Sequence, residues 1–273
     1  MTLKTLKRHS ALFSLALACL GAAAPSQAAQ PALIESGHLT YGTAATFMPF
    51  EFMKNNRISG FDIDLITAIG HTLSLTPVAM PMEFKGLIPA LQGKRIDIIN
   101  SAMYINATRA EQVDFVPYLR IGSRVVVRKG NPEHITGRDH SLCGKNIAVT
   151  LGGIEESQAR VDDKHCRDAG LKGINVMTFP AATDSAVAVA QGRADAEFLS
   201  TPGAVALLSE KGDVFETAGG EFESDTQIGF AVRKGDSAMK HLLETGLHQV
   251  VQDGTYQQLI EKWRFPASVA MFK

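Results

Sequence analysis

One arginine in a polar stretch has the clearest capacity for binding chemistry in this sequence. Arg109 follows Asn106 and Thr108 and precedes Glu111 and Gln112. A guanidinium stays charged at physiological pH and can form two parallel hydrogen bonds to a carboxylate. The polar neighbours are equally typical of a surface arginine at the start of a helix. The residues alone therefore leave Arg109 open between a carboxylate-binding residue and an exposed one.

A glycine pair offers a second place for a charged ligand. Gly152 and Gly153 follow the apolar stretch 147–151, and a helical pattern begins at Ile154 and Glu155. Free N–H groups at the start of a helix favour an anion, and glycine lets the backbone approach a ligand closely. The alternative is an ordinary turn between a strand and a helix, with Glu155 as an acid that the helix dipole stabilises.

Two serines stand at the ends of similar segments. Residues 92–97 read Gln-Gly-Lys-Arg-Ile-Asp and lead to Ser101, while residues 191–195 read Gln-Gly-Arg-Ala-Asp and lead to Ser200. Each segment contains a helix stop, a basic residue, an aspartate and the start of an apolar strand. Two similar units that face each other would place these strand ends at a shared cleft, where open sheets bind ligands.

Strand and helix signals alternate along the chain, which indicates the α/β class. The apolar residues after Gly60 recur at helical spacing, with Asp62 and Asp64 in the first turn, where the helix dipole favours acids. Thr183 or Asp184 is expected to cap a helix that runs to residue 190. The expected strands span residues 39–43, 76–82, 96–100, 147–151 and 194–199, and further helices begin at residues 87 and 154.

Two extended segments, 121–128 and 226–233, are candidates for crossings between two lobes. If both cross, one lobe comprises residues 29–121 and 227–273 and is discontinuous, while the other comprises residues 122–226. Two crossings would form a hinge that lets the lobes close on a cleft without disrupting either core.

The first 28 residues have the pattern of a cleavable signal peptide. A positive start that contains Lys4, Lys7 and Arg8 precedes an apolar run that is too short to remain across a bilayer. Ser26 and Ala28 then supply the small residues that a signal peptidase recognises. A lipoprotein was the alternative because of Cys19, but the residues before it fit a lipidation box poorly. We therefore expect a periplasmic protein.

Charge and composition narrow the range of partners. The chain has 27 basic and 28 acidic residues, and three of the basic ones lie in the predicted signal peptide. The mildly acidic balance without a basic run argues against nucleic acid or an anionic membrane as a partner. Cys143 and Cys166 are the two cysteines after that segment, and they are either a disulfide or two separate thiols. His165 next to Cys166 has no further ligands at metal spacing, so we expect no metal and no cofactor.

Several segments together resemble family 3 of the periplasmic solute-binding proteins, which serve importers of polar amino acids. The similarity covers nearly all of the chain after the signal peptide. The segments that carry it are Gly42-Thr43, Pro49-Phe50-Glu51, Gly60 to Leu65, Leu87 to Leu91, Thr108-Arg109, Asp114-Phe115, Pro117-Tyr118, Cys143-Gly144-Lys145, Gly192 to Ala196, Asp253 to Tyr256 and Lys262-Trp263. The resemblance implies a periplasmic-binding-protein-like, two-lobed fold with two hinge crossings and a cleft site. It also implies a disulfide between Cys143 and Cys166.

The same resemblance implies roles for individual residues. It implies that Arg109 binds the carboxylate of the ligand, assisted by the strand end at Ser101, Ala102 and Tyr104. At Ala102, which replaces a more common hydroxyl residue, only the backbone N–H would remain as a donor. Phe47 and Phe84 match positions at which relatives place aromatic walls around the side chain of the ligand; a core position is the alternative for each.

Two positions depart from the family pattern. Ser200 stands where relatives carry an aspartate for the ammonium group of the ligand, and Ala44 stands where some binders of cations carry an acid. A desolvated ammonium needs a counter-charge or full hydrogen bonding. Glu155 is the nearest candidate substitute, whereas we expect Glu197 to point to the other side of its strand. Lysine and arginine are therefore disfavoured as ligands, and a neutral or modified amino acid or an amine-free carboxylate is favoured.

The interpretation that we favour is a monomeric binding protein that delivers an amino acid or related small carboxylate to the permease subunits of an ABC importer. The first alternative is an enzyme on the same fold, similar to cyclohexadienyl dehydratase, with Glu155 as a general acid. The second is a ligand-sensing domain that acts through a separate partner. Fold alone does not distinguish these functions.

Overall fold

The computed structural model describes residues 1–2 and 31–272 of the chain. The predicted signal peptide, apart from its first two residues, therefore lies outside the described residues, as does Cys19. Within the described part, no helix has both the length and the apolar character needed to cross a membrane.

A five-stranded mixed sheet forms the centre of the first lobe, in the order β5–β1–β6–β13–β7. The neighbours β5, β1 and β6 are parallel, whereas β13 runs antiparallel to both β6 and β7. Its strands are β1 (His38–Thr43), β5 (Thr76–Pro81), β6 (Ile98–Tyr104), β7 (Val113–Arg120) and β13 (Gln227–Arg233). Its helices are α1 (Phe61–Thr72), η1 (Phe84–Gly86), α2 (Leu87–Gln92), α3 (Ala107–Ala110), α7 (Ser237–Gln252), α8 (Thr255–Lys262) and η3 (Ala267–Val269).

A small antiparallel sheet of β2 (Thr46–Phe47), β3 (Glu51–Lys54) and β4 (Arg57–Ser59) leads into α1. The chain approaches itself closely at Gly60, where a Cβ atom would lie 1.9 Å from the carbonyl oxygen of Phe50. Gly60 also has a φ of 145°, in the region that favours glycine. The glycine therefore permits the turn that places β3 beside the start of α1.

The second lobe repeats this plan with the sheet order β10–β9–β11–β8–β12. Here β10, β9 and β11 are parallel, and β8 runs antiparallel to β11 and β12. Its strands are β8 (Ser123–Arg128), β9 (Asn146–Thr150), β10 (Asn175–Phe179), β11 (Ala196–Ser200) and β12 (Phe215–Phe222). Its helices are η2 (His140–Leu142), α4 (Ile154–Asp168), α5 (Ala182–Ala190) and α6 (Thr201–Lys211). The predicted cap of α5 is wrong, because α5 starts after Ala181 and neither Thr183 nor Asp184 caps it.

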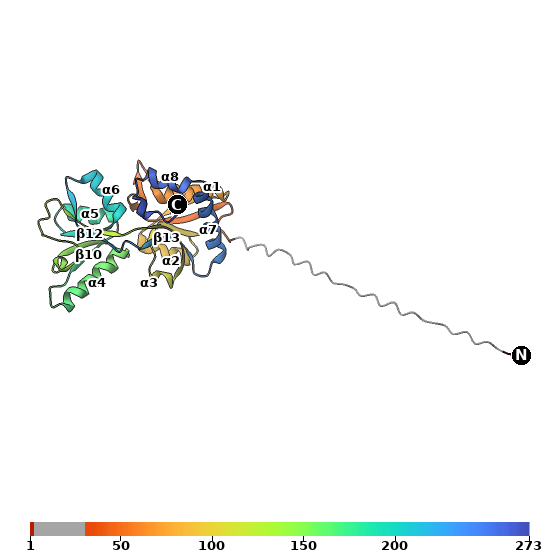
Figure 1. Cartoon of the computed structure of the whole chain (residues 1–273), viewed down its shortest axis with the longest axis horizontal. Helices are drawn as coiled ribbons and strands as arrows, with labels where there is room; N and C mark the ends of the chain where they lie inside the picture. The colour runs from red at the N-terminus through yellow and green to blue at the C-terminus, as the bar shows by residue number, and fades with distance from the viewer. Residues whose placement is uncertain (3–30, 273) are drawn as a thin grey trace.

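The chain passes between the two sheets twice, and the two lobes stand side by side (Figure 1). The first crossing joins β7 to β8 at Ile121 and Gly122, and the second joins β12 to β13 through residues 223–226. The crossings touch, since the backbone N–H of Ile121 donates to the carbonyl of Thr226 at 2.7 Å. The predicted α/β fold with two lobes and two hinge crossings is confirmed.

The two lobes have cores of different character. Aromatic rings pack through the first lobe, where Phe61 contacts Phe265 at 5.1 Å between centroids and Tyr118 contacts Phe230 at 4.6 Å. The hydroxyl of Tyr256 donates to the carbonyl of Tyr118 at 2.7 Å and attaches α8 to this core. The core of the second lobe is mainly aliphatic. Aromatic side chains bury large areas each, so the first lobe gains more hydrophobic stabilisation per residue.

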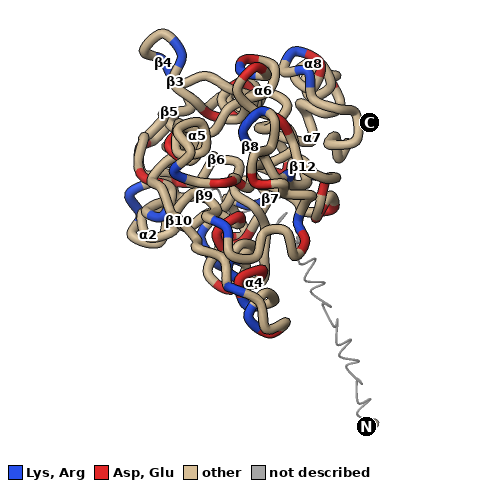
Figure 2. Tube along the Cα trace, turned by 90° about the vertical axis from the view of Figure 1, so that its left-hand side faces the viewer, with Lys and Arg blue, Asp and Glu red and all other residues tan. Residues whose placement is uncertain are grey.

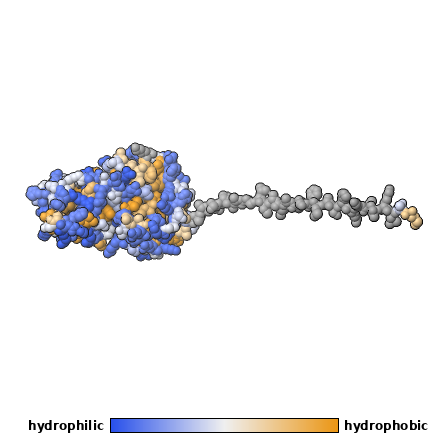
Figure 3. Space-filling model, turned by 60° about the horizontal axis from the view of Figure 1, so that its bottom comes forward, coloured by the Kyte–Doolittle hydropathy of each residue, from blue (hydrophilic) through white to orange (hydrophobic). Residues whose placement is uncertain are grey.

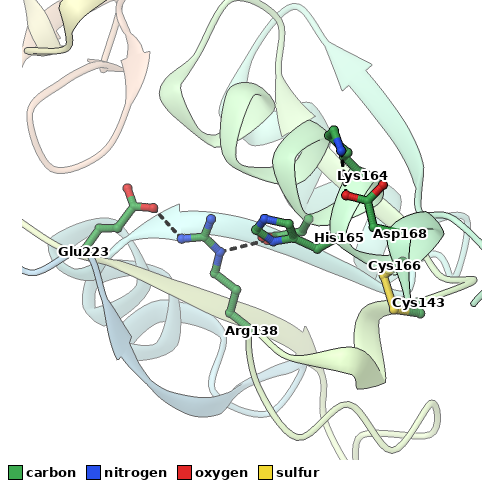
Figure 4. Close-up of polar contacts among 8 residues, drawn as sticks. Arg138, Cys143, Lys164, His165, Cys166, Asp168 and Glu223 are labelled. Atoms are coloured by element: carbon green, nitrogen blue, oxygen red, sulfur yellow. Dashed lines mark hydrogen bonds and ion pairs between the residues drawn. A yellow bond between two sulfur atoms is a disulfide. The ribbon is translucent and has the colours of Figure 1, made fainter. Parts of the chain in front are cut away.

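A disulfide between Cys143 and Cys166 joins the segment before β9 to α4, as predicted. The bridge closes a loop with a sequence separation of 23, which in the chain-entropy description stabilises by about 3 kcal/mol. On the same side of the lobe, Arg138 pairs with Asp162 of α4 and with Glu223 of the second crossing (Figure 4). The bridge and this ion-pair group hold α4 against its own sheet and the hinge.

Charges of both signs are interspersed along the trace (Figure 2). On α4 they form pairs four residues apart, such as Glu156 with Arg160 and Lys164 with Asp168. Hydrophilic residues cover most of the face shown in Figure 3, with hydrophobic residues scattered among them. Such a mixed surface is typical of an aqueous environment.

Candidate ligand-binding site

A small cavity lies between the two lobes and receives side chains from both. The first lobe contributes Ala44, Thr46, Phe47, Glu51, Phe84 and Tyr104. The second lobe contributes Thr150, Gly153, Ile154, Glu155, Ala182, Ser185, Glu197, Phe198 and Leu199. Six of the predicted site residues line this cavity: Phe47, Phe84, Tyr104, Gly153, Ile154 and Glu155. Four do not: Ser101, Ala102, Arg109 and Ser200.

Aromatic residues form the wall of the cavity on the side of the first lobe. Phe47 on β2 packs against Phe50 at 5.0 Å between ring centroids, and Phe84 begins η1. Tyr104 ends β6 and is 2 % exposed. Burial raises the pKa of Tyr104 well above its ordinary value, so its hydroxyl stays neutral. These rings can hold carbon chains and cations, but they supply no anionic charge.

Arg109 is a buried residue that bridges the lobes. It lies on α3, whose N-cap Asn106 accepts the backbone N–H of Arg109 through its side chain at 2.9 Å. The guanidinium donates to the carbonyl of Tyr104 at 2.7 Å and, across the lobes, to the carbonyl of Gly152 at 2.8 Å. It also stacks on Phe84, with 5.3 Å from Cζ to the ring centroid. With 8 % exposure, the alternative of a surface arginine is wrong.

Arg109 keeps binding capacity beyond these contacts. A guanidinium has five N–H donors in a planar arrangement, and the two carbonyl contacts occupy part of that set. The guanidinium stacks on Phe84 and binds the carbonyl of Tyr104, and both of these residues line the cavity.

The expected donors at the end of β6 are engaged within the first lobe. The hydroxyl of Ser101 accepts the N–H of Ala44 at 2.9 Å and donates to Oε1 of Glu51 at 2.8 Å. The backbone N–H of Ala102, a residue with a left-handed φ of 40°, donates to Oδ2 of Asp62 at 2.7 Å. Neither group faces the cavity, so both support the wall from behind.

Ser200 has a local structural role. It is the N-cap of α6, and its hydroxyl accepts the N–H of Gly203 at 3.1 Å. Ser200 is fully buried but does not line the cavity. Its position in the structure therefore explains the hydroxyl by helix capping, without a ligand.

The turn before α4 is also partly satisfied by the protein itself. The N–H of Gly153 donates to the carbonyl of Thr150 at 2.9 Å, and the N–H of Gly152 donates to the Glu156 carboxylate at 2.8 Å. The carboxylate of Glu155 accepts its own backbone N–H, which lowers its pKa. The start of α4 therefore contacts the cavity with a carboxylate rather than with a row of free N–H groups.

Glu197 is one of several lining residues that were not predicted as part of the site. The expectation that it points away was wrong, because Glu197 lines the cavity together with Glu155. The acids are 1 % and 7 % exposed, respectively. Burial is the main cause that raises the pKa of Glu155 to about 7 and that of Glu197 to about 8, and the charge of Glu155 adds to the second shift. A glutamate within an otherwise apolar strand was the signal that could have identified it.

Glu51 is a third carboxylate in the cavity wall, on the side of the first lobe. Its pKa is raised well above the ordinary value, first by burial and then by the nearby charge of Asp62, while the bond from Ser101 opposes the shift. Within residues 31–272, no group of three or more histidine, cysteine, aspartate or glutamate residues is placed to hold a metal ion. The cavity therefore combines aromatic walls and three acids with one adjacent arginine.

Comparisons with known proteins agree on one family. The profile of the bacterial extracellular solute-binding proteins, family 3, matches residues 39–267. The L-cystine-binding protein TcyJ of Escherichia coli is 28% identical over 84% of this chain and 83% of its own length. A probable histidine-binding protein of Campylobacter jejuni is 31% identical over 82% of this chain and 84% of its own length.

Solved structures give the same picture. An ancestral arginine-binding protein bound to arginine is 36% identical, with a TM-score of 0.76 and coverage of 84% of this chain and 99% of that chain. An ancestral amino-acid-binding protein described as a precursor of cyclohexadienyl dehydratase is 33% identical, with a TM-score of 0.73 and coverage of 83% and 95%, respectively. These similarities extend over both lobes of the chain.

Proposed function

Because this chain belongs to the bacterial extracellular solute-binding proteins of family 3, we propose that it captures an amino acid between its lobes for an ABC importer. The observation that carries the proposal is the cavity between the lobes, with aromatic walls and a buried arginine at its edge. A zwitterion needs a cationic partner, an anionic partner and surfaces for its carbon atoms, and the cavity and its edge have all three.

In this proposal Arg109 binds the carboxylate of the ligand. The residues that contact the rest of the ligand are Phe47, Phe84, Tyr104, Gly153, Ile154 and Glu155. Ser101 and Ala102 support the wall through Glu51 and Asp62, and Ser200 shapes the second lobe by capping α6. The moving units are residues 29–121 with 227–273, and residues 122–226.

The same proposal covers location and partners. An N-terminal signal peptide of 28 residues directs the protein to the periplasm, in line with the extracellular character of the family. There the closed form docks as a monomer on the permease subunits of the importer. The disulfide fits an oxidising compartment.

A thermal-shift screen of the mature protein, refolded without ligand, tests the proposal. An amino acid that binds only the native state raises the midpoint, by an amount equivalent to about 2.7 kcal/mol at 100 times Kd. We expect Arg109→Ala and Arg109→Lys to abolish the shift, because neither presents a planar guanidinium. The matched control Arg95→Ala, an exposed arginine of the same lobe, should keep it. No shift with any amino acid would reject the proposed function.

An enzyme is the second candidate, favoured by the buried Glu155 with its pKa of about 7 and by the similarity to the dehydratase precursor. A carboxyl group that stays protonated near neutral pH can act as a general acid. Consumption of a cyclohexadienyl substrate such as prephenate by wild type, but not by Glu155→Gln, would establish this alternative. Binding of amino acids without turnover would reject it.

A further inference from the structure

The carboxylates of Glu155 and Glu197 have few protein partners for their burial: Glu197 has none among the described residues, and Glu155 is bonded by its own backbone N–H and by the side chain of Tyr104. Both oxygens of Glu197 and Oε1 of Glu155 are buried without a hydrogen bond from any described residue. Neither acid takes part in an ion pair within 4 Å among the described residues. A buried carboxylate without a partner costs several kcal/mol when it is ionised. Two such acids in the lining of one cavity are suited to a positively charged ligand.

The surrounding charges do not supply the missing cation. Arg109 acts on Glu155 and lowers its pKa, but its guanidinium already donates to two carbonyls. Glu223, from the second crossing, acts in the opposite direction on Glu155. The one titratable group that acts on Glu197 among the described residues is Glu155 itself.

The opposite wall adds a further acid. Glu51 lines the cavity from the first lobe, and its Oε2 is also buried without a partner. Tyr104 and Ser185 contribute neutral groups. With its acids ionised, the cavity would hold three carboxylates against one adjacent guanidinium, so a positively charged ligand would stabilise the ionised acids.

We propose that Glu155 and Glu197 form a subsite for a cationic head group with N–H donors, an ammonium or a guanidinium, which displaces a proton when it binds. This subsite rests on the proposed function and names its ligand class: an amino acid with a cationic group that reaches α4 and β11 of the second lobe. It replaces the acid that is absent at Ser200. It also reverses the expectation from the sequence that lysine and arginine are disfavoured.

The exchange of charge is balanced. Before a cation binds, Glu155 and Glu197 together hold at least one proton near neutral pH, because one carboxyl group has a pKa of about 7 and the other of about 8. When R–NH₃⁺ enters, the carboxyl O–H bond breaks, its proton leaves to water, and the carboxylate accepts N–H hydrogen bonds from the ligand. The ligand keeps its own protons, so the complex gains no net charge.

Titration calorimetry at pH 6, 7, 8 and 9 tests the subsite, with buffers of different ionisation enthalpy to count the protons released. The probes are L-arginine and L-lysine, L-norleucine as a matched α-amino acid without a side-chain cation, and 6-aminohexanoate as a matched acid without an α-ammonium. We expect the affinity for the preferred cation to rise up to tenfold from pH 6 to pH 7 and to level off above pH 8. About one proton should be released at pH 7.

Three variants locate the effect. Glu197→Gln and Glu155→Gln should each weaken binding of the cation by at least tenfold and change its pH dependence, and the double variant should remove the pH dependence. Glu210→Gln is the matched control, an exposed acid on α6 of the same lobe outside the cavity lining, and should behave as wild type. Tight binding of lysine and 6-aminohexanoate places the side-chain cation at the pair, whereas equal binding of lysine and norleucine places the α-ammonium there.

The outcomes separate this inference from the proposed function. If an amino acid binds in an Arg109-dependent way, but Glu197→Gln and Glu155→Gln keep its affinity and pH dependence, the subsite is wrong and the proposed function stands. If no amino acid binds wild type, both fail. Thermal unfolding of each variant at pH 5 shows whether it is folded, since both acids are neutral there.

Discussion

Buried acids occur in both lobes, but their surroundings differ. In the first lobe, Oδ2 of Asp62 accepts the N–H of Ala102 and Oε1 of Glu51 accepts the hydroxyl of Ser101. In the second lobe, Glu197 has no partner on either oxygen among the described residues. Burial raises the pKa of all three carboxyl groups.

The comparison teaches that a raised pKa by itself does not identify a binding residue. Asp62 has a pKa of about 7, close to that of Glu155, yet its carboxylate fixes the backbone of β6. The hydrogen bonds distinguish Asp62 from Glu197: Oδ2 of Asp62 accepts a backbone N–H from β6, whereas neither oxygen of Glu197 has a partner among the described residues. Removal of an acid should therefore have opposite effects on stability in the two lobes.

The largest effect is expected for Glu197→Gln in the absence of ligand. The folded pKa of about 8 lies above the ordinary value of 4.5, so the stability that the neutral carboxyl group contributes is complete below pH 4.5. It is lost as the pH rises from 4.5 through 8, at roughly 1.4 kcal/mol per pH unit and on the order of 5 kcal/mol in total.

Urea unfolding of wild type and Glu197→Gln at pH 5 and pH 8 measures this difference. The variant should match wild type at pH 5 and exceed it at pH 8, whereas Glu210→Gln, at an exposed acid of the same lobe, should follow wild type at both. A variant that loses stability at pH 8 would mean that Glu197 has a structural partner, and the contrast between the lobes would disappear.

A smaller effect of opposite sign is expected at Asp62. At pH 5 the carboxyl group of Asp62 is neutral and accepts the N–H of Ala102. Ala102 has a left-handed backbone conformation although it is not a glycine. Asp62→Ala leaves this buried N–H without an acceptor and should cost about 2 kcal/mol. Asp62→Asn keeps an acceptor oxygen and should remain near wild type. Urea unfolding at pH 5 compares the two, and equal losses would contradict the role assigned to the hydrogen bond.

Much of the fold could be predicted from the sequence because its signals are local. The spacing of apolar residues after Gly60 and after Gly153 predicts where α1 and α4 start. The repeated Gln-Gly pattern predicts that the chain contains two units with similar folds. The disulfide followed from the resemblance to a family and from two cysteines beyond the signal peptide. The six predicted residues that line the cavity all lie at or near element ends that such signals locate.

The side of the strand on which Glu197 lies could not be predicted for a physical reason. All five residues of β11 are buried, since the strand is central in its sheet and lies between β9 and β8. Alternation of polar and apolar residues marks the faces of half-exposed strands and is absent from such a strand. The position of Ser200 was also a poor guide to the face on which Glu197 lies. The chain turns into α6 at Ser200, so the side chain of Ser200 does not indicate a face of β11.

The hydrogen bonds of Ala102 with Asp62 and of Ser101 with Glu51 could not be predicted from the sequence either, because they join residues that are far apart in it. Asp62 and Ala102 are 40 positions apart, and Glu51 and Ser101 are 50 apart. Local patterns place these residues on elements but do not reveal their partners. Only the packing of β3 and α1 on β6 shows that these groups are already engaged.

The smallest effect separates two buried serines and tests the comparison at its most sensitive point. Ser101→Ala removes a donor to Glu51 and an acceptor for Ala44, so it should cost about 1 kcal/mol and raise the pKa of Glu51 further. Ser185 of α5 is 2 % exposed, lines the cavity and has an unpartnered hydroxyl among the described residues. Ser185→Ala should leave stability unchanged or slightly higher, because no hydrogen bond is lost. Urea unfolding at pH 7 resolves a difference of this size. An equal loss of stability for both serines would show that hydrogen-bond partners in the fold do not predict which polar groups of the second lobe are available to a ligand.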